Sequence, residues 1–159
     1  MNRTAMLVPV SEQIPSSLQG ACHSYIDELM PIATRREALK KKYQFDCACE
    51  GCLDEERNIR MEAWSCGICV GGLVPNKEGA SCTLCGWTMS RDHYELCRAA
   101  EEAAIASRPK IENDFIALET KKQLCEKLIE LFQDTIHTFN VHRIPFLRCL
   151  YIASLAAQE

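Results

Sequence analysis

Two pairs of cysteines have the spacing of a tetrahedral metal site. Each pair is a C-x2-C motif, and twelve residues separate the motifs: Cys66 and Cys69, then Cys82 and Cys85. Two tight turns of this kind can direct four thiolates at one ion, and four soft ligands at this spacing suit zinc. Glycines at Gly67, Gly71 and Gly86 permit the backbone conformations that such turns need. We expect one firmly bound structural zinc. The alternatives are four buried reduced cysteines or a redox role, which is disfavoured because neither motif opens a helix after a strand.

A second cluster is a C-x-C-x2-C motif with three thiolates, Cys47, Cys49 and Cys52. A closed zinc site needs four ligands, so this motif is one ligand short. Cys22 or His23 could supply it, although both lie more than twenty residues upstream. An open position could instead hold a catalytic water, but no adjacent His and Glu pair supports that chemistry. We predict a second, weaker zinc site here.

Composition limits the compartment and the partners of the protein. The chain has 159 residues, which fits one domain or two very small ones, and its formal net charge is −4. Only Lys77 and Arg91 lie near the C-x2-C motifs, so nucleic-acid binding is disfavoured. An odd number of cysteines and the absence of a basic, then apolar leader favour a reducing compartment, cytoplasmic and/or nuclear. No apolar run approaches the roughly 20 residues of a membrane helix, so we expect no membrane association.

The elements that position these cysteines are expected to be mainly helical, with a small β or irregular zinc-bound part. Residues 1–31 suggest short strands and a loop. A short helix is predicted to end near Tyr43, and Thr34 and Glu37 could form its capping box. Residues 43–87 hold seven cysteines with little periodicity, so metal must hold them in place. The basic side chains of Arg35, Arg36 and residues 40–42 could contact an acidic substrate or DNA, but they are interpreted as a solvated helix face.

From Ser90 onward the chain contains no glycine and has helical periodicity. One helix is predicted from Ser90 to about residue 107, before Pro109. A second is predicted to end at about residue 138, and Pro145 suits the first turn of a third. Three cysteines and three apolar residues are expected in the helix-packing core: Cys97, Cys125, Cys149, Phe132, Ile136 and Phe139. The three histidines of this region, His93, His137 and His142, have no ligand-like spacing and are interpreted as ordinary surface or packing residues.

The pattern that runs from the first tyrosine to the three-cysteine cluster resembles a known family. Ser24-Tyr25-Ile26-Asp27 is followed by Tyr43-Gln-Phe45-Asp-Cys47-Ala-Cys49-Glu-Gly-Cys52. This is similar to the C-terminal edge of the SET domain and the post-SET motif of SET-and-MYND (SMYD) type protein-lysine methyltransferases. Residues 3–10 resemble the strand before the tyrosine segment of that family, and residues 139–143 resemble the opening of its tetratricopeptide-like helical region. The resemblance divides the chain into an end of a SET domain (1–31), a post-SET segment (32–54), a zinc loop (55–89) and an incomplete helical region (90–159).

The resemblance implies transfer of a methyl group from S-adenosylmethionine to a lysine of a protein substrate, histone or non-histone. Tyr25 matches the tyrosine usually regarded as catalytic, and Tyr43 matches the one that walls the lysine channel. Phe45 would line this channel or the edge of the cofactor pocket. In the family, two segments upstream in the sequence bind the cofactor: a glycine-containing segment and an Asn-His-Ser-Cys stretch. The Asn-His-Ser-Cys stretch also supplies the fourth ligand of the post-SET zinc. This chain contains neither segment and no MYND finger, so we expect a remnant of a larger enzyme that is inactive alone.

A different class of function also fits these residues. The chain could be a zinc-stabilised helical adaptor that binds protein partners through its C-terminal helices and performs no chemistry. A nucleic-acid-binding zinc ribbon ranks below both interpretations because of the acidic net charge.

Overall fold

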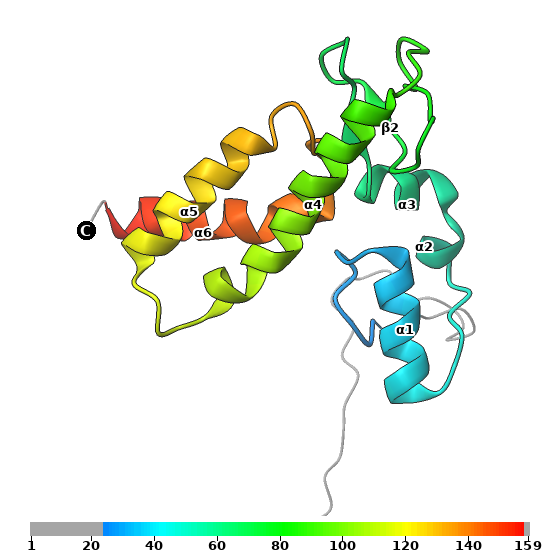
Figure 1. The fold of residues 1–159 in the computed structure, drawn as a ribbon. Helices are drawn as coiled ribbons and strands as arrows, with labels where there is room; N and C mark the ends of the chain where they lie inside the picture. Colours follow the sequence, from blue (N-terminus) through cyan, green and yellow to red (C-terminus); the bar gives the residue numbers. More distant parts are fainter. Residues whose placement is uncertain (1–23, 158–159) are drawn as a thin grey trace, which may run out of the picture.

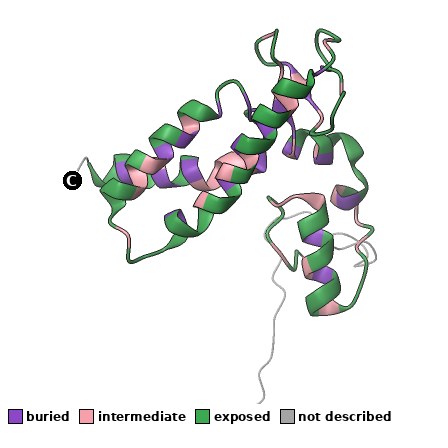
Figure 2. Ribbon diagram, in the orientation of Figure 1, coloured by how far each residue is buried: buried purple, intermediate pink, exposed green. Residues whose placement is uncertain are grey.

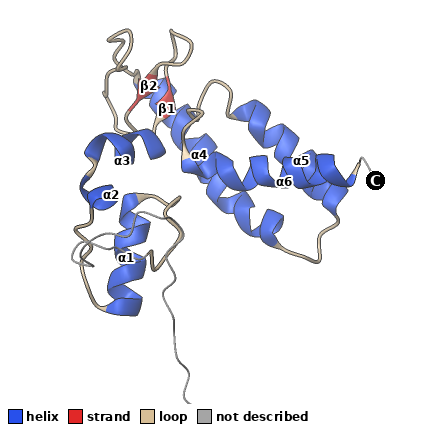
Figure 3. Cartoon of the chain, turned by 180° about the vertical axis from the view of Figure 1, so that it is seen from behind, coloured by secondary structure: helices blue, strands red, loops and turns tan. Residues whose placement is uncertain are grey.

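The computed structural model describes residues 24–157 and confirms a mainly α fold with a small, cysteine-rich β part (Figure 1). The elements in chain order are α1 (Ile32–Tyr43), α2 (Glu50–Leu53), α3 (Glu55–Met61), β1 (Trp64–Ser65), β2 (Leu73–Val74), α4 (Arg91–Glu112), α5 (Leu118–Leu131), the 3-10 helix η1 (Val141–Arg143) and α6 (Ile144–Ala156). The long helices α4, α5 and α6 pack together, β1 and β2 carry two loops beside the start of α4, and α1 lies apart from the bundle (Figure 3).

The bundle forms because α4, α5 and α6 bury the apolar stripes predicted from their periodicity (Figure 2). Phe132 and Phe146 meet edge to face at its centre, with ring centroids 5.5 Å apart. Cys97, Cys125 and Cys149 are buried among the helices, as predicted. Each contributes a small apolar side chain at a point of close helix approach.

Two predicted helix ends in this region are wrong. α4 continues through Pro109 to Glu112, because burial of Ile111 and an ion pair between Arg108 and Glu112 at 2.7 Å hold its last turn. α5 ends at Leu131 rather than near residue 138. Its continuation turns away to pair with β1, where the backbone amide of Ser65 donates to the carbonyl of Thr135 at 2.9 Å.

That turn also separates the apolar residues expected to share one packing face. Phe132 and Ile136 are fully buried, but Phe139 is 60% exposed and lies against the guanidinium of Arg60. The third helix begins as predicted, with Pro145 in the first turn of α6.

The short helix predicted before the cysteines is α1, but its start differs from the prediction. The amide of Arg35 donates to the carbonyl of Pro31 at 2.9 Å, so Thr34 lies inside the first turn and forms no capping box. Residues 24–31 belong to the part of the chain, residues 1–31, that was expected to contain short strands and a loop. They form a loop in which Asp27 accepts a hydrogen bond from the amide of Leu29 at 2.9 Å. Residues 1–23, including Cys22 and His23, lie outside the described residues.

Helices also occupy part of the segment predicted to be irregular. Asp54 caps α3 by accepting a hydrogen bond from the amide of Arg57 at 2.9 Å, which explains how such a short helix begins. β1 then pairs antiparallel with β2, and an isolated bridge joins Ser81 to Thr88. None of the helices in the described part of the chain is long and apolar enough to span a membrane.

Candidate metal centres and an adjoining aromatic cluster

The two C-x2-C motifs converge on one point, as predicted from their spacing. The four-cysteine site consists of Cys66, Cys69, Cys82 and Cys85, whose Sγ atoms all lie within 4.8 Å of one another. The Sγ atoms of Cys66 and Cys85 are 3.6 Å apart, and those of Cys69 and Cys82 are 3.7 Å apart. Zinc–sulfur bonds of about 2.3 Å in a tetrahedron place the sulfurs about 3.8 Å from one another. All four thiols are free of disulfides, so the arrangement fits a closed tetrahedral zinc site.

Backbone amides face two of these sulfurs. The amides of Ile68 and Leu84 each lie 3.4 Å from the Sγ of the cysteine two residues earlier, Cys66 and Cys82 respectively. Burial raises the pKa of the Cys82 thiol, but hydrogen bonds from the amides of Cys85 and Leu84 and from the thiols of Cys66 and Cys69 together lower the pKa to about 7. These donors favour the thiolate, which is the form that binds metal.

Gly72 shapes the cradle for the metal and was missed from the sequence. A methyl group at this position would lie 2.6 Å from the Sγ of Cys82 and closer still to the Sγ of Cys69. The sequence interpretation instead singled out Gly67, Gly71 and Gly86, of which Gly71 and Gly86 do adopt positive φ angles of 74° and 72°. The only sequence signal for the space that Gly72 leaves beside the sulfurs is its position next to another glycine, Gly71.

Two histidines interpreted as ordinary packing residues hold the four-cysteine site against the helical bundle. The Nε2 of His93, in the first turn of α4, lies 3.0 Å from the carbonyl of Ser65, beside Cys66. The Nε2 of His137 lies 3.4 Å from the carbonyl of Gly71. His137 is buried, and the ring of His93 packs edge to face on Trp87, with centroids 5.2 Å apart. The finger, residues 64–89 around the four-cysteine site, is therefore attached to the bundle at Ser65 and at Gly71, on either side of its first pair of cysteines.

The C-x-C-x2-C motif also gathers its sulfurs. The three-cysteine site consists of Cys47, Cys49 and Cys52, whose Sγ atoms lie within 4.8 Å of one another. Burial and the neighbouring thiols raise the pKa of Cys52 to about 11, whereas a hydrogen bond from Cys47 is the main cause that lowers the pKa of Cys49. Among residues 24–157, no fourth Cys, His, Asp or Glu joins this set. The geometry suits a metal whose coordination is completed from elsewhere.

An aromatic cluster adjoins the three-cysteine site and contains the three residues singled out by the resemblance. The ring of Tyr25 lies 4.9 Å from that of Tyr43 and 6.0 Å from that of Phe45, measured between centroids. Tyr43 ends α1, and Phe45 leads from it toward Cys47. Tyr25 is 52% exposed. The Nζ of Lys42 lies 5.1 Å from the Tyr43 ring centroid, a cation–π contact between neighbours in the chain.

A groove of about 450 Å³ lies between the loop before α1 and the helical bundle. Asp27 and Leu29 line one wall, and residues from α4, α5, η1 and α6 line the other. Its charged side chains have both signs, among them Arg108, Glu112 and Lys121. The charges that line the groove therefore do not favour either an acidic or a basic partner.

Comparison with known proteins gives two curated relatives. The chain is 71% identical over 158 residues, 99% of its length, to SET domain-containing protein 14 of Caenorhabditis elegans, of which it covers 37%. It is 27% identical over 110 residues, 68% of its length, to the protein-lysine N-methyltransferase SMYD4 of Pongo abelii, of which it covers 12%. No protein-family model matches the chain, and no solved structure matches it significantly. The chain spans 37% of the length of the first relative and 12% of the second. The predicted resemblance is therefore confirmed as a similarity: nearly the whole chain is similar to part of a SET domain-containing protein.

Proposed function

We propose that this chain is part of a SET-type protein-lysine N-methyltransferase of the SMYD kind that uses S-adenosylmethionine. The observation that carries the proposal is the contact of Tyr25 with Tyr43 and Phe45 beside a three-thiolate cluster. Helical periodicity alone gives no reason for these residues to meet, whereas the family resemblance requires it. The similarity to a SET domain-containing protein and to a lysine methyltransferase supports the same function.

The aromatic cluster has the chemistry to hold a lysine side chain. S-adenosylmethionine, when bound, would supply a methyl group to the lysine amine by in-line displacement, with a neutral thioether as the leaving group, after the lysine ammonium has lost its proton to solvent. Aromatic faces attract the lysine ammonium as it approaches, and the exposed face of Tyr25 leaves room for it. The phenol hydroxyls of Tyr25 and Tyr43 can orient the amine without competing as nucleophiles. Phe45 would exclude water from the apolar part of the channel or line the cofactor pocket.

The cysteines have a structural role in this proposal. Four thiolates in a closed shell leave no open position for catalysis, so zinc at the four-cysteine site would hold the finger and its contacts with α4. Zinc at the three-cysteine site would fix the loop that follows Phe45. Its fourth ligand would come from another segment of the enzyme.

We further propose that the isolated chain does not bind S-adenosylmethionine. In the resembled family the cofactor-binding segments lie outside the part matched here. The test uses a chimera in which the 158 matched residues of this chain replace the corresponding segment of the longer Caenorhabditis elegans relative. Calorimetric titration should detect cofactor binding by the chimera and none by the isolated chain. Equal binding by both proteins would contradict the proposal.

A helical adaptor remains a second candidate function, and the groove between Leu29 and the bundle is the observation that favours it. Ile152 on α6 lines this groove and is 45% exposed. An adaptor predicts that a protein partner binds normally to Tyr25→Phe and Tyr43→Phe variants but not to Ile152→Asp. Sensitivity to the tyrosine substitutions instead would favour the enzyme.

A further inference from the structure

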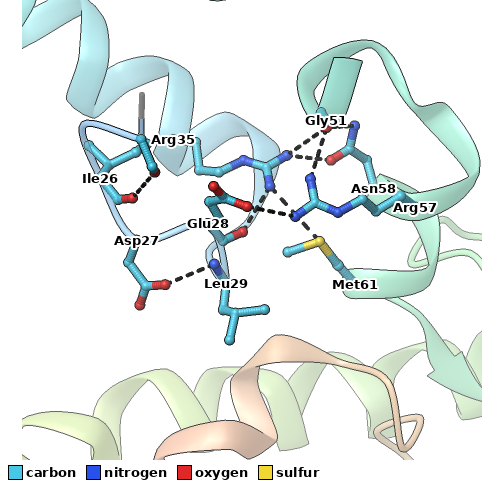
Figure 4. Close-up of polar contacts among 10 residues, drawn as sticks. Ile26, Asp27, Glu28, Leu29, Arg35, Gly51, Arg57, Asn58 and Met61 are labelled. Atoms are coloured by element: carbon cyan, nitrogen blue, oxygen red, sulfur yellow. Dashed lines mark hydrogen bonds and ion pairs between the residues drawn. The ribbon is translucent and has the colours of Figure 1, made fainter. Parts of the chain in front are cut away.

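Arg35 is a buried cation in a segment whose other basic side chains are exposed. It was interpreted with Arg36 and residues 40–42 as part of a solvated helix face, and this interpretation is wrong for Arg35, which is only 3% exposed. Its side chain leaves the first turn of α1 and enters the space between the loop that follows Tyr25 and helices α2 and α3 (Figure 4). A buried guanidinium must find hydrogen-bond acceptors there, because an unpaired buried charge is strongly unfavourable.

The acceptors come from both segments that flank α1. One terminal nitrogen, Nη1, donates to the backbone carbonyl of Glu28 at 2.9 Å. The other, Nη2, donates to the Oδ1 of Asn58 at 2.5 Å and to the carbonyl of Gly51 at 3.4 Å. Gly51 lies between Cys49 and Cys52, and Glu28 lies three residues after Tyr25. One planar group therefore joins the cysteine loop to the tyrosine segment.

Arg57 joins the same two segments a second time. Its Nη1 donates to the carbonyl of Gly51 at 3.2 Å, and its Nη2 lies 3.8 Å from the carboxylate of Glu28. The Nδ2 of Asn58 also donates to the Gly51 carbonyl, at 3.4 Å. Three donors converge on a single carbonyl inside the three-cysteine motif (Figure 4). This convergence fixes the position of the loop between two of the metal-binding cysteines.

The charge of these side chains also suits a metal-loaded loop. Arg36 donates to the carbonyl of Cys52 at 3.3 Å, so three arginines surround the motif. Three thiolates and one divalent ion carry a net charge of about −1, which these cations stabilise. A lysine at position 35 would keep the charge but could not present two nitrogens in a fixed fork to acceptors on opposite sides.

We propose that Arg35 is a positioning residue that couples metal binding at the three-cysteine site to the placement of Tyr25 against Tyr43. Metal at Cys49 and Cys52 fixes the Gly51 carbonyl, Arg35 carries that constraint to Glu28, and Glu28 holds the segment that bears Tyr25. The role of this contact in lysine methylation rests on the proposed function. The coupling itself does not, because it is measured without a substrate.

The test compares Arg35→Lys with wild type and with Arg98→Lys, a matched substitution at an exposed, ion-paired arginine of α4. Cobalt titrations followed by thiolate-to-metal absorption give separate affinities for the two sites. Nuclear Overhauser effects between the rings of Tyr25 and Tyr43 in the zinc-saturated protein report their contact. We expect Arg35→Lys to weaken the three-cysteine site by about tenfold or more. It should also remove the ring-to-ring signals at saturating zinc, while the four-cysteine site and Arg98→Lys behave as wild type.

Two results would overturn the inference. One is wild-type affinity and wild-type ring contacts in Arg35→Lys, and the other is weakened metal binding with the ring contacts unchanged. Should Arg35→Lys fail to fold, Asn58→Ala decides, because it leaves Arg35 in place but removes the acceptor that holds its Nη2 beside the Gly51 carbonyl: loss of the ring contacts supports the coupling and their retention refutes it. A chimera that transfers no methyl groups would refute the proposed function and leave these readouts intact.

Discussion

Replacing Gly72 with alanine tests whether the four-cysteine site is a closed metal cradle. The added methyl group would lie 2.6 Å from the Sγ of Cys82 and 2.9 Å from the Cβ of Cys66. Favourable contacts between such atoms lie at about 3.5–4.0 Å, so a sulfur must move by about 1 Å. A metal–ligand distance tolerates only about 0.2 Å. We therefore expect at least one thiolate to leave the coordination shell.

The size of the effect follows from the energy of the site. Structural zinc sites contribute roughly 10–16 kcal/mol at neutral pH, or about 2.5–4 kcal/mol for each of four ligands. Loss of one ligand should therefore lower zinc affinity about 100-fold or more. Gly79→Ala is the matched control, because Gly79 has a φ of 71° but nothing lies within 4 Å of an added methyl group. It should cost about 1 kcal/mol of stability and leave zinc affinity unchanged.

The assay is competition for zinc against a chromophoric chelator, with circular dichroism as a check on folding. The two variants separate steric crowding of the metal site from backbone strain. An alanine at position 72 would crowd the sulfurs, whereas an alanine at position 79 would only strain the backbone. Zinc affinity of Gly72→Ala within threefold of wild type would refute the reasoning, as would an equal loss in Gly79→Ala.

Three further measurements test the fold and its dependence on metal and pH. Phe132→Ala should lower the free energy of unfolding by about 3–5 kcal/mol in urea denaturation, because the Phe132 ring is fully buried. The control Phe115→Ala, at a side chain that is 99% exposed, should change the free energy of unfolding by less than about 0.5 kcal/mol. Equal effects of the two substitutions would contradict the assigned core. Chelation of zinc should shift the fluorescence of Trp64 and Trp87, which flank the four-cysteine site, while most of the helical circular dichroism remains; loss of both signals together would contradict this. Burial and a neighbouring arginine lower the pKa of His142 below its usual 6.5, so the unfolded chain takes up a proton that the folded chain does not. Stability should therefore fall as the pH drops below about 6.5, and His142→Gln should reduce this slope; an unchanged slope would count against the assignment.

The convergence of the four thiols at the four-cysteine site could be predicted, because the spacing of the two motifs determines which thiols can approach one point. Gly72 could not be predicted in the same way, since its importance depends on how closely one loop approaches another. The three-cysteine site was likewise visible as a motif. The contact of Tyr25 with Tyr43 and Phe45, beside this motif, was implied only by the family resemblance, because no periodicity relates Tyr25 to Tyr43.

Tertiary contacts account for the predictions that were wrong. Pro109 is an ordinary signal for a helix end, but burial of Ile111 holds the helix beyond it. Residues after Leu131 continue the apolar pattern of α5, yet pairing with β1 draws them away. Arg35 looks like its basic neighbours in sequence, and only acceptors from three separate segments reveal that it is buried.

The most direct test of the proposed function is methyl transfer by the chimera described above. Its wild-type, Tyr25→Phe and Tyr151→Phe forms would be incubated with labelled S-adenosylmethionine and protein substrates, and methylated lysines would be measured by mass spectrometry. Tyr151 is an exposed tyrosine on α6 and serves as the control. We predict methylation by the wild-type and Tyr151→Phe chimeras and a loss of at least about tenfold in Tyr25→Phe, because in the proposed function the phenol hydroxyl orients the amine. Equal methylation by all three forms would contradict the assigned role of Tyr25, and absence of lysine methylation in every form would contradict the proposed function.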